Sequence, residues 1–386
     1  MLKFAHLTNL RSPNVGNAAL TLGSERTLEQ DSENKIQFQR IAWDDYTFGK
    51  KSFLTDFVPE IINSDALLVA GAVTFNGRVD FREAGMRFNL SLDQIRSIEI
   101  PIIFYGVSYR YWSSEPYPNR NALRDALTLL CEDNKNKIAV RNDGTREWLK
   151  KFVGFHHENL SVIPDPGLFV RYGTQKTPKS DVPYVCLSLN NEDAVERFRN
   201  QENQEKFLVD IAGILSFILD NFLVDVYLVP HSFEDLALIE NVTRRITPIS
   251  LHQRVRVLGL PRFEDAESVY EVYQGASLVI ASRVHSMSPA LGMKVPVITV
   301  TTQDRLTHFM RELGLSDLVL DFESKELLVE LKRLTFEILS LQNTYLSGIE
   351  DAVDDARLQI RDFNKEVLKT TRLHSSGSLE RDEGMA

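Results

Sequence analysis

The sequence predicts an α/β protein made of two doubly wound, Rossmann-like domains that face one another across a cleft, followed by C-terminal helices. Two observations predict this fold. The chain of 386 residues is 43% hydrophobic and 25% charged, so it is long enough for two cores of ordinary size. Short apolar runs that end at Gly, Asn, Asp or Pro alternate with helical stretches, which is typical of parallel strands buried on both faces.

The first domain is predicted over residues 1–171. Its strand candidates are continuous apolar runs rather than alternating ones, which favours burial on both faces of a parallel sheet. They are 3–9, 35–43, 66–72, 101–109, 137–142 and 160–166. The next segment, 172–183, is rich in Gly, Pro, Lys and Ser and predicts a linker.

The second domain is predicted over 184–345, where the same alternation begins again. Its strand candidates are 184–189, 224–231, 255–259, 277–281 and 295–300. From Leu327 onward, apolar residues spaced by threes and fours predict a helix packed on its own domain, with a short coiled coil as the alternative. A further helix is predicted over 346–372, and the tail 373–386 lacks an apolar pattern and is expected to be disordered.

Composition excludes several classes of function. The formal net charge of -10 argues against a broad nucleic-acid surface and against electrostatic binding to an anionic membrane. The two cysteines lie far apart without metal-ligand spacing, which argues against a disulfide framework and a structural zinc site. No apolar run reaches the roughly 18 residues of a membrane helix, so we expect a cytoplasmic protein.

The most informative stretch is ASRVHSMSPALGMKVPVITV, residues 281–300. Arg283 and His285 fall in the turn between a predicted core strand and a helix that begins near Ser286. A guanidinium beside a helix N-terminus suits a phosphate or a carboxylate, and a bound anion would raise the pKa of a neighbouring histidine. A structural role for both residues is the alternative, but their joint placement favours function.

Two other turns carry polar side chains where a strand ends. PNVGNAAL, residues 13–20, offers Asn14 and Asn17 around a glycine that lets backbone approach a ligand; a plain capped turn is the alternative. LVPHSFED, residues 228–235, ends a strand with His231, which could orient a substrate or take a proton; a helix cap formed by Ser232 and Asp235 is the alternative.

Turns of the first domain are weaker candidates. VRNDGTREWLKK (140–151) and VIPDPGLFV (162–170) place Arg141 and Asp165 after strands, where a structural turn is the commoner explanation. The segment RVDFREAGMR, which begins at Arg78, and SYRYW combine arginines with aromatic residues. Such a combination suits a sugar acceptor, and a solvated loop explains it equally well.

Taken in order, NVGNAAL, LLVAGA, PIIFYGVS, AVRNDGTREWLKK, VIPDPGLF, VPHSFED and ASRVHSMSPALGMKVPVI resemble the polysaccharide pyruvyl transferase family. The resemblance spans about residues 7–320. Its most specific element is Ser-Arg-X-His followed by a helix and Gly-X-X-Val-Pro-Val. It implies a GT-B-like fold and transfer of pyruvate from phosphoenolpyruvate to two hydroxyl groups of a sugar, as a cyclic ketal.

The resemblance also implies roles for particular residues, with no metal and no cofactor besides phosphoenolpyruvate as co-substrate. Arg283 would hold the donor and His285 would be the general acid. The expected donor-binding residues are Arg283, Ser286, Arg305 and His231, and the expected acceptor-binding residues are Asn14, Asn17, Gly71 and Arg78. Arg305 stands where the family commonly has lysine, and alanines flank Gly71 where the family commonly has glycines.

The expected partners are phosphoenolpyruvate and a sugar, a glycan or its lipid-linked precursor, and not nucleic acid. Contact with membrane-bound glycan machinery and the oligomeric state stay open. Two alternatives remain: a glycosyltransferase that uses a nucleotide sugar, and a catalytically inactive carbohydrate-binding relative. Protection by a nucleotide would favour the first of these, and saturable sugar binding without a donor effect would favour the second.

Overall fold

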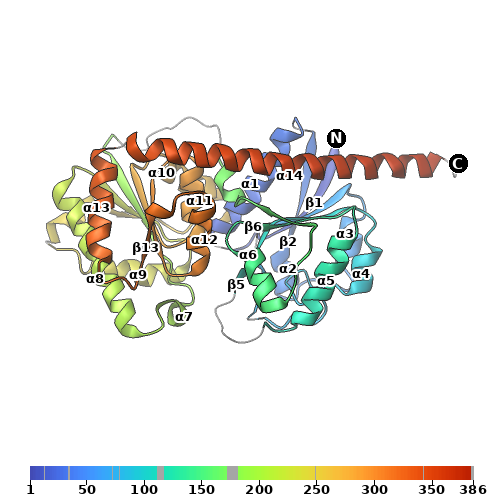
Figure 1. The fold of residues 1–386 in the computed structure, drawn as a ribbon, viewed down its shortest axis with the longest axis horizontal. Coiled ribbons are helices and arrows are strands. Elements are labelled where there is room, and N and C mark those ends of the chain that lie inside the picture. The colour runs from blue at the N-terminus through green and yellow to red at the C-terminus, as the bar shows by residue number, and fades with distance from the viewer. Residues whose placement is uncertain are drawn as a thin grey trace. The chain divides into compact units, whose positions relative to one another are not determined.

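The computed structural model describes residues 1–12, 14–33, 35–71, 73–77, 79–110, 117–171, 181–247, 249–341 and 343–383 (Figure 1). The chain forms two compact units. Unit 1 comprises Met1–Arg11, Leu20–Pro166 and Ala356–Ala386, and unit 2 comprises Ser12–Ala19 and Gly167–Asp355. Each unit contains one parallel sheet, so the predicted pair of doubly wound α/β domains is confirmed.

Unit 1 contains a parallel sheet in the order β2-β1-β3-β5-β6-β7, and β4 pairs with β5 outside this path. The strands are β1 (Leu2–Thr8), β2 (Ile36–Ala42), β3 (Ala66–Val69), β4 (Val73–Asn76), β5 (Ile102–Arg110), β6 (Lys137–Arg141) and β7 (Leu160–Ile163). Every residue of β3 is buried, as its continuous apolar run predicts. The strand β4 was not predicted separately from β3, because only a short turn divides the two.

The helices of unit 1 are α1 (Val15–Asp31), α2 (Trp43–Thr47), α3 (Phe57–Ile61), α4 (Leu92–Ser97), α5 (Arg120–Glu132) and α6 (Thr145–Trp148). In α5 the residues Leu123, Leu127 and Leu130 recur at threes and fours and are fully buried. The first turn of α1 belongs to unit 2 rather than unit 1. The sequence predicted a single boundary near residue 171 and did not predict this exchange of a short segment.

Unit 2 contains a second parallel sheet, in the order β10-β9-β8-β11-β12-β13. Its strands are β8 (Tyr184–Ser188), β9 (Asp225–Leu228), β10 (Val255–Val257), β11 (Leu278–Ala281), β12 (Val297–Thr301) and β13 (Val319–Asp321). Along the chain, β8, β9 and β10 extend the sheet in one direction, and β11, β12 and β13 then extend it in the other direction from β8. The order therefore reverses between β8 and β11, and the carboxyl ends of these strands form the crevice where such sheets bind ligands.

The helices of unit 2 are α7 (Ala194–Phe198), α8 (Gln201–Asn221), α9 (Phe233–Thr243), α10 (Ala266–Gln274), α11 (Val284–Gly292), α12 (Asp304–Glu312) and α13 (Leu327–Ser340). α13 packs against α8 within this unit. In α11, a Cβ atom added at Gly292 would lie 1.7 Å from the carbonyl oxygen of Leu168. This backbone approach explains the glycine of the Gly-X-X-Val-Pro-Val run.

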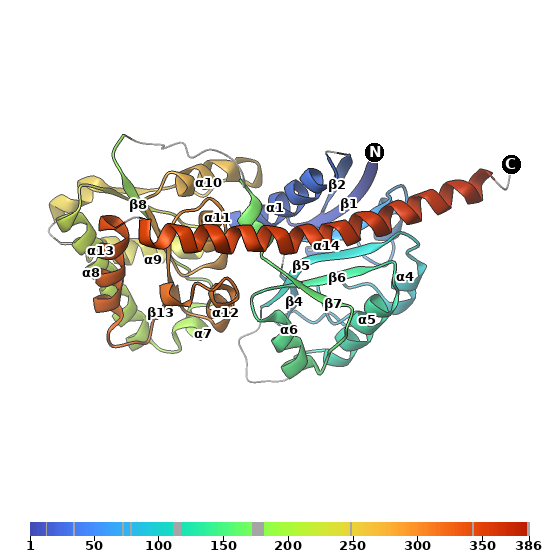
Figure 2. The same ribbon diagram turned by 45° about the horizontal axis from the view of Figure 1, so that its top comes forward.

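The C-terminal helix α14 (Asn343–Glu383) is longer than predicted (Figures 1 and 2). The sequence predicted a helix over 346–372 and a disordered tail over 373–386, whereas the helix continues through Ser375 and Gly377 to Glu383. A glycine inside a helix costs only about 1 kcal/mol relative to alanine, and extending an existing helix needs no new nucleus. Most of the predicted linker lies outside the described residues.

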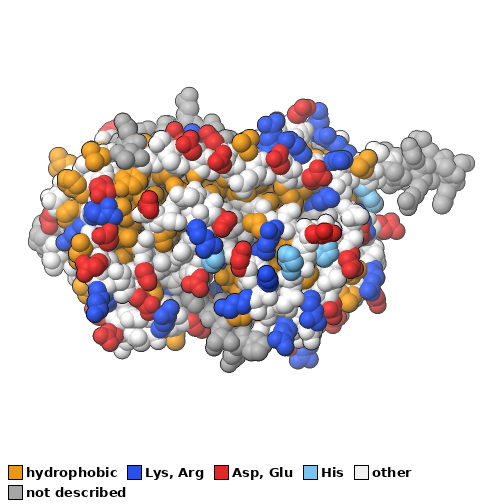
Figure 3. All heavy atoms as spheres, viewed as in Figure 1, with side chains coloured by type: hydrophobic (Ala, Val, Ile, Leu, Met, Phe, Trp, Pro, Cys, Tyr) orange, Lys and Arg blue, Asp and Glu red, His pale blue; other side chains and the backbone are white. Residues whose placement is uncertain are grey.

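Lys and Arg side chains are interspersed with Asp and Glu on the face of the molecule that Figure 3 shows. Within the described part of the chain, no helix is both long enough and apolar enough to cross a membrane.

Candidate functional site

The candidate site lies at the carboxyl edge of the sheet in unit 2, on both sides of the point where the strand order reverses. Four strands deliver charged side chains to this edge, and their loops bond to one another. We call the following residues the carboxyl-edge cluster: Glu192 and Arg197 after β8, His231 and Asp235 after β9, Arg283 and His285 after β11, and Arg305 after β12.

Arg283 is the N-cap residue of α11 and is 4% exposed. Its Nη2 atom donates to both carboxylate oxygens of Asp235 at 2.8 Å, and its Nη1 atom donates to Oε1 of Glu192 at 3.2 Å. Burial opposes the charge, but Glu192 and Asp235 together raise the pKa of Arg283 above its ordinary value. The guanidinium is therefore held in one orientation.

Asp235 is fully buried and anchors this arrangement. Besides Arg283, it accepts hydrogen bonds from the backbone amides of Asn191, His231 and Ser232, at 2.9, 2.9 and 3.0 Å. One carboxylate thus joins the loops after β8, β9 and β11. The Nε atom of Arg283 is buried and has no hydrogen-bond partner among the described residues.

Arg197 is a member of the cluster that was not predicted from the sequence. It is 2% exposed, its Nε atom donates to the carbonyl oxygen of Glu192 at 3.0 Å, and its Nη1 atom donates to Oγ1 of Thr302 at 2.5 Å. Burial first, and then the nearby guanidiniums of Arg283 and Arg305, lower the pKa of Arg197 to about 9. Arg283 and Arg305 therefore disfavour the positive charge of Arg197, and an anion bound beside Arg197 would offset this repulsion.

His285 lies in the first turn of α11 and is 8% exposed. It packs directly on Gly16 in the first turn of α1, where an added Cβ atom would lie 2.3 Å from Nδ1 of His285. The glycine of the NVGNAAL motif therefore makes room for the histidine of the Ser-Arg-Val-His motif. Each motif can be recognised in the sequence, but the sequence does not indicate that the two motifs are in contact.

The asparagines of NVGNAAL reach the same place. Oδ1 of Asn14 accepts from the amide of Gly16 at 2.9 Å, and Nδ2 of Asn14 donates at 3.2 Å to the Glu192 oxygen that also accepts from Arg283. The amide of Asn17 bonds to the carbonyl oxygen of Asn14 at 3.0 Å. Asn14 therefore shares Glu192 with Arg283, and Asn14 and Asn17 lie on either side of the glycine that contacts His285.

Ser286 and His231 have contacts that indicate structural roles. Ser286 is fully buried and its Oγ atom donates to the carbonyl oxygen of Arg283 at 3.0 Å. Nε2 of His231 bonds to the hydroxyl of Tyr273 at 2.7 Å, and burial, with a smaller contribution from Arg283, lowers the pKa of His231 well below its usual value. His231 is therefore neutral, which favours support of the loop over proton transfer.

Gly71 belongs to unit 1, and the structure gives it a packing role there. Its φ is +76°, and an added Cβ atom would lie 2.0 Å from Oγ1 of Thr8 and 2.5 Å from Oγ1 of Thr21. The two threonine hydroxyls bond to each other at 2.5 Å. The predicted acceptor role of Gly71 stays a prediction, and Arg78 lies outside the described residues.

A second charged network lies in unit 1 at the carboxyl ends of β6 and β7. Arg141, Asp143 and Asp165 are each at most 1% exposed, and Nε of Arg141 lies 3.2 Å from Oδ2 of Asp165. Thr145 donates to Asp143 at 2.5 Å, and Asn142 accepts from the amide of Asp165 at 3.1 Å. Two turns that looked separate in the sequence therefore form one buried network.

Across the described residues, there is no group of three or more His, Cys, Asp or Glu side chains that could hold a metal ion.

Comparison with solved structures defines the class of fold. MnaA of S. aureus, solved with UDP, matches with a TM-score of 0.53 at 13% identity, over 91% of each chain. HepE of Anabaena, solved with UDP-glucose, matches with a TM-score of 0.53 at 14% identity, over 97% of this chain and 100% of that one. A UDP-N-acetylglucosamine 2-epimerase, described as putative, from Listeria monocytogenes matches with a TM-score of 0.52 at 12% identity, over 99% and 97%. The fold is therefore GT-B-like, the fold of glycosyltransferases and epimerases.

Residues 14–304 match the family described as polysaccharide pyruvyl transferase. The match covers well over half of the chain and includes Asn14, Arg197, Arg283 and His285. The chain therefore belongs to the polysaccharide pyruvyl transferase family, which is a family of transferases. No curated protein matches the chain.

Proposed function

We propose that this protein transfers pyruvate from phosphoenolpyruvate to two hydroxyl groups of a saccharide, forming a cyclic ketal. One observation carries this proposal. In a member of the pyruvyl transferase family, the Ser-Arg-Val-His run lies where the strand order of the second sheet reverses, and Arg197 and Arg305 lie near its arginine. The saccharide would belong to a polysaccharide, a glycan or a lipid-linked precursor.

The donor is small and carries both a phosphate and a carboxylate, so it needs several cations at close range. Arg197, Arg283 and Arg305 supply them in a protein whose net charge is -10. Guanidiniums bind phosphate and carboxylate groups through paired hydrogen bonds. Arg305 takes the place of the lysine that is common in the family, and it lies in the first turn of α12, directly after Asp304.

His285 would deliver the proton that starts the reaction. Protonation of C3 of the enolpyruvyl group makes C2 electrophilic, and one sugar hydroxyl then forms a bond to C2 and releases its proton to the imidazole. The C2–O bond to phosphate breaks with the electron pair leaving on phosphate, and the second hydroxyl then bonds to C2, gives its proton to the released phosphate and closes the ketal. Asn14 and Asn17, next to His285, would bond to the hydroxyl groups of the acceptor.

The wild-type protein provides the first test. We expect phosphoenolpyruvate to stabilise it against thermal unfolding, by about 2.7 kcal/mol at a ligand concentration of 100 Kd, and UDP-glucose to leave it unchanged. Adding a panel of saccharides should then release inorganic phosphate with a stoichiometry of one per ketal formed. Stabilisation by UDP-glucose and not by phosphoenolpyruvate would instead identify a nucleotide-sugar glycosyltransferase.

Arg197→Ala is expected to weaken phosphoenolpyruvate binding by about tenfold or more, because a charge-assisted hydrogen bond contributes about 1.5–3 kcal/mol. The measurement is calorimetric titration with phosphoenolpyruvate. Arg199→Ala is the matched control, because Arg199 is two residues away, is 68% exposed and pairs with Glu323 outside the cluster. Equal affinities for the two variants would remove Arg197 from the donor site.

A further inference from the structure

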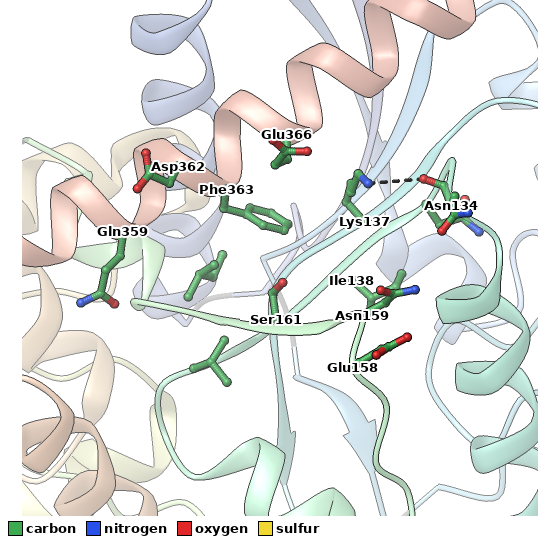
Figure 4. A pocket seen from close by; sticks show the side chains of 13 residues that line it. Asn134, Lys137, Ile138, Glu158, Asn159, Ser161, Gln359, Asp362, Phe363 and Glu366 are labelled. Carbon is green, nitrogen blue, oxygen red and sulfur yellow. Dashed lines mark hydrogen bonds between the residues drawn. The ribbon is translucent and has the colours of Figure 1, made fainter.

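A hollow lies within unit 1, between α14 and the strands β6 and β7 (Figure 4). It has a volume of about 430 Å³, which is within the range of small-molecule sites. One wall consists of the loop before β6, the start of β6, the loop before β7 and most of β7, and the other wall is a face of α14. Arg141, Asp143 and Asp165 do not line the hollow, although Ile163, at the carboxyl end of β7, does. We call this hollow the α14 groove.

The wall formed by α14 presents Gln359, Asp362, Phe363 and Glu366, which recur at threes and fours and so share one face of the helix. Gln359 and Glu366 are exposed. Asp362 accepts a hydrogen bond from Lys365 at 2.7 Å. Figure 4 shows the ring of Phe363 between the helix and the strands.

The opposite wall is also polar and contains Lys137, Glu158 and Asn159. The Nδ2 atom of Asn159 donates to the carbonyl oxygen of Cys131 at 2.9 Å, and Lys137 donates to the carbonyl oxygen of Asn134 at 3.3 Å. These bonds fix the two side chains in place. β7 is also the edge strand of its sheet. Its outward-facing backbone N–H and C=O groups therefore have no neighbouring strand to bond to among the described residues, and they add donors and acceptors to this wall.

The charge of the lining restricts the ligand. The lining contains one lysine, Lys137, and the carboxylates of Glu158, Asp362 and Glu366, and Lys365 beside the groove pairs with Asp362. The α14 groove therefore keeps a net negative charge, which disfavours anionic ligands such as phosphoenolpyruvate. Amide and carboxylate groups suit a ligand that is rich in hydroxyl groups, because hydroxyls both donate to carboxylates and accept from amides.

Phe363 adds an apolar surface of fixed orientation. Its ring is 9% exposed and is held by an edge-to-face contact with Tyr105, with the ring centroids 5.5 Å apart. Because only 9% of Phe363 is exposed, a sugar ring would contact the outer edge of this side chain while its hydroxyls bond to the polar lining. The polar lining and the side chain of Phe363 together fit a neutral saccharide better than a peptide or an anion.

We propose that the α14 groove is a secondary binding site for a neutral saccharide chain, separate from the site of transfer. The identity of the ligand as part of the acceptor glycan rests on the proposed function. A second contact on the same glycan would raise the effective concentration of its reactive end at the transfer site. The groove holds the chain and takes no part in the chemistry.

The test is a titration of the full-length protein with neutral hexasaccharides of glucose, mannose and galactose, without phosphoenolpyruvate, followed by calorimetry and by amide NMR. We expect at least one hexasaccharide to bind and to shift the side-chain amide signals of Asn159 and Gln359. The double variant Gln359→Ala/Glu366→Ala should weaken this binding by about fivefold or more. The control is Arg361→Ala/Lys369→Ala, which changes two exposed residues of the same helix that do not line the groove.

Two results would overturn the proposal: no binding of any hexasaccharide at millimolar concentration, or binding that the groove variant does not weaken. His285→Ala separates this proposal from the proposed function, because it removes the transfer chemistry and should leave groove binding intact. Phosphate release with a monosaccharide acceptor, which is too short to reach a second contact, should in turn be the same in the groove variant and the wild type. Failure of transfer with intact groove binding would count only against the proposed function.

Discussion

Arg283→Ala is expected to lower the rate of the proposed pyruvyl transfer by about 10³-fold or more, because Arg283 would hold the negative charge of the donor with a side chain that is 4% exposed. The same substitution should lower the free energy of unfolding by about 3–5 kcal/mol, because it removes one partner of a buried ion pair. Asp235 would lose both 2.8 Å hydrogen bonds from Arg283 and remain fully buried. Phosphate release and urea denaturation measure the two effects.

Two further variants separate stability from activity. Arg283→Ala/Asp235→Asn removes the buried carboxylate as well, so it should recover part of the stability and none of the transfer. Arg333→Ala is a control for the loss of an arginine with two carboxylate partners, because Arg333 bonds to Glu330 and Glu337 on an exposed face and should contribute at most about 1 kcal/mol. Normal transfer by a folded Arg283→Ala protein would refute the assigned role.

His285→Ala is expected to lower transfer by about 10²–10⁴-fold, which is the usual contribution of a positioned acid or base. Phosphoenolpyruvate should still stabilise the variant, because the arginines of the carboxyl-edge cluster remain. A loss of transfer together with a loss of donor stabilisation would instead show that His285 binds the donor. Single-turnover phosphate release, measured beside the thermal shift, distinguishes the two results.

Gly16→Ala tests the same histidine without changing it. The added methyl group would lie 2.3 Å from Nδ1 of His285, so the imidazole must move. A displacement of about 1 Å at a reacting group can cost about 10²-fold in rate. Gly348→Ala is the control, because Gly348 lies in α14 with nothing within 4 Å of the added atom. Full transfer activity in Gly16→Ala would show that the position of His285 is unimportant.

Local patterns along the chain were sufficient to predict the architecture and the main motif. Continuous apolar runs closed by turn residues are typical of strands buried on both faces of a parallel sheet, and this pattern is contained within each short segment. The position of Arg283 and His285 after an apolar strand is equally local, so the chain alone places both at a carboxyl strand end. The family resemblance depends on the same short segments, and the family match supports it.

Which distant segments meet was settled only by the folded arrangement. Arg197 resembles any helical arginine in the sequence, and its burial beside Arg283 and Arg305 follows from the strand order, which brings β8, β11 and β12 together. The Asp235 anchor, the contact of Gly16 with His285 and the approach of Gly292 to Leu168 join residues far apart in the chain. The physical reason is that periodicity and turn chemistry report which face of an element is buried, whereas the partner on that face is set by packing and electrostatics in three dimensions.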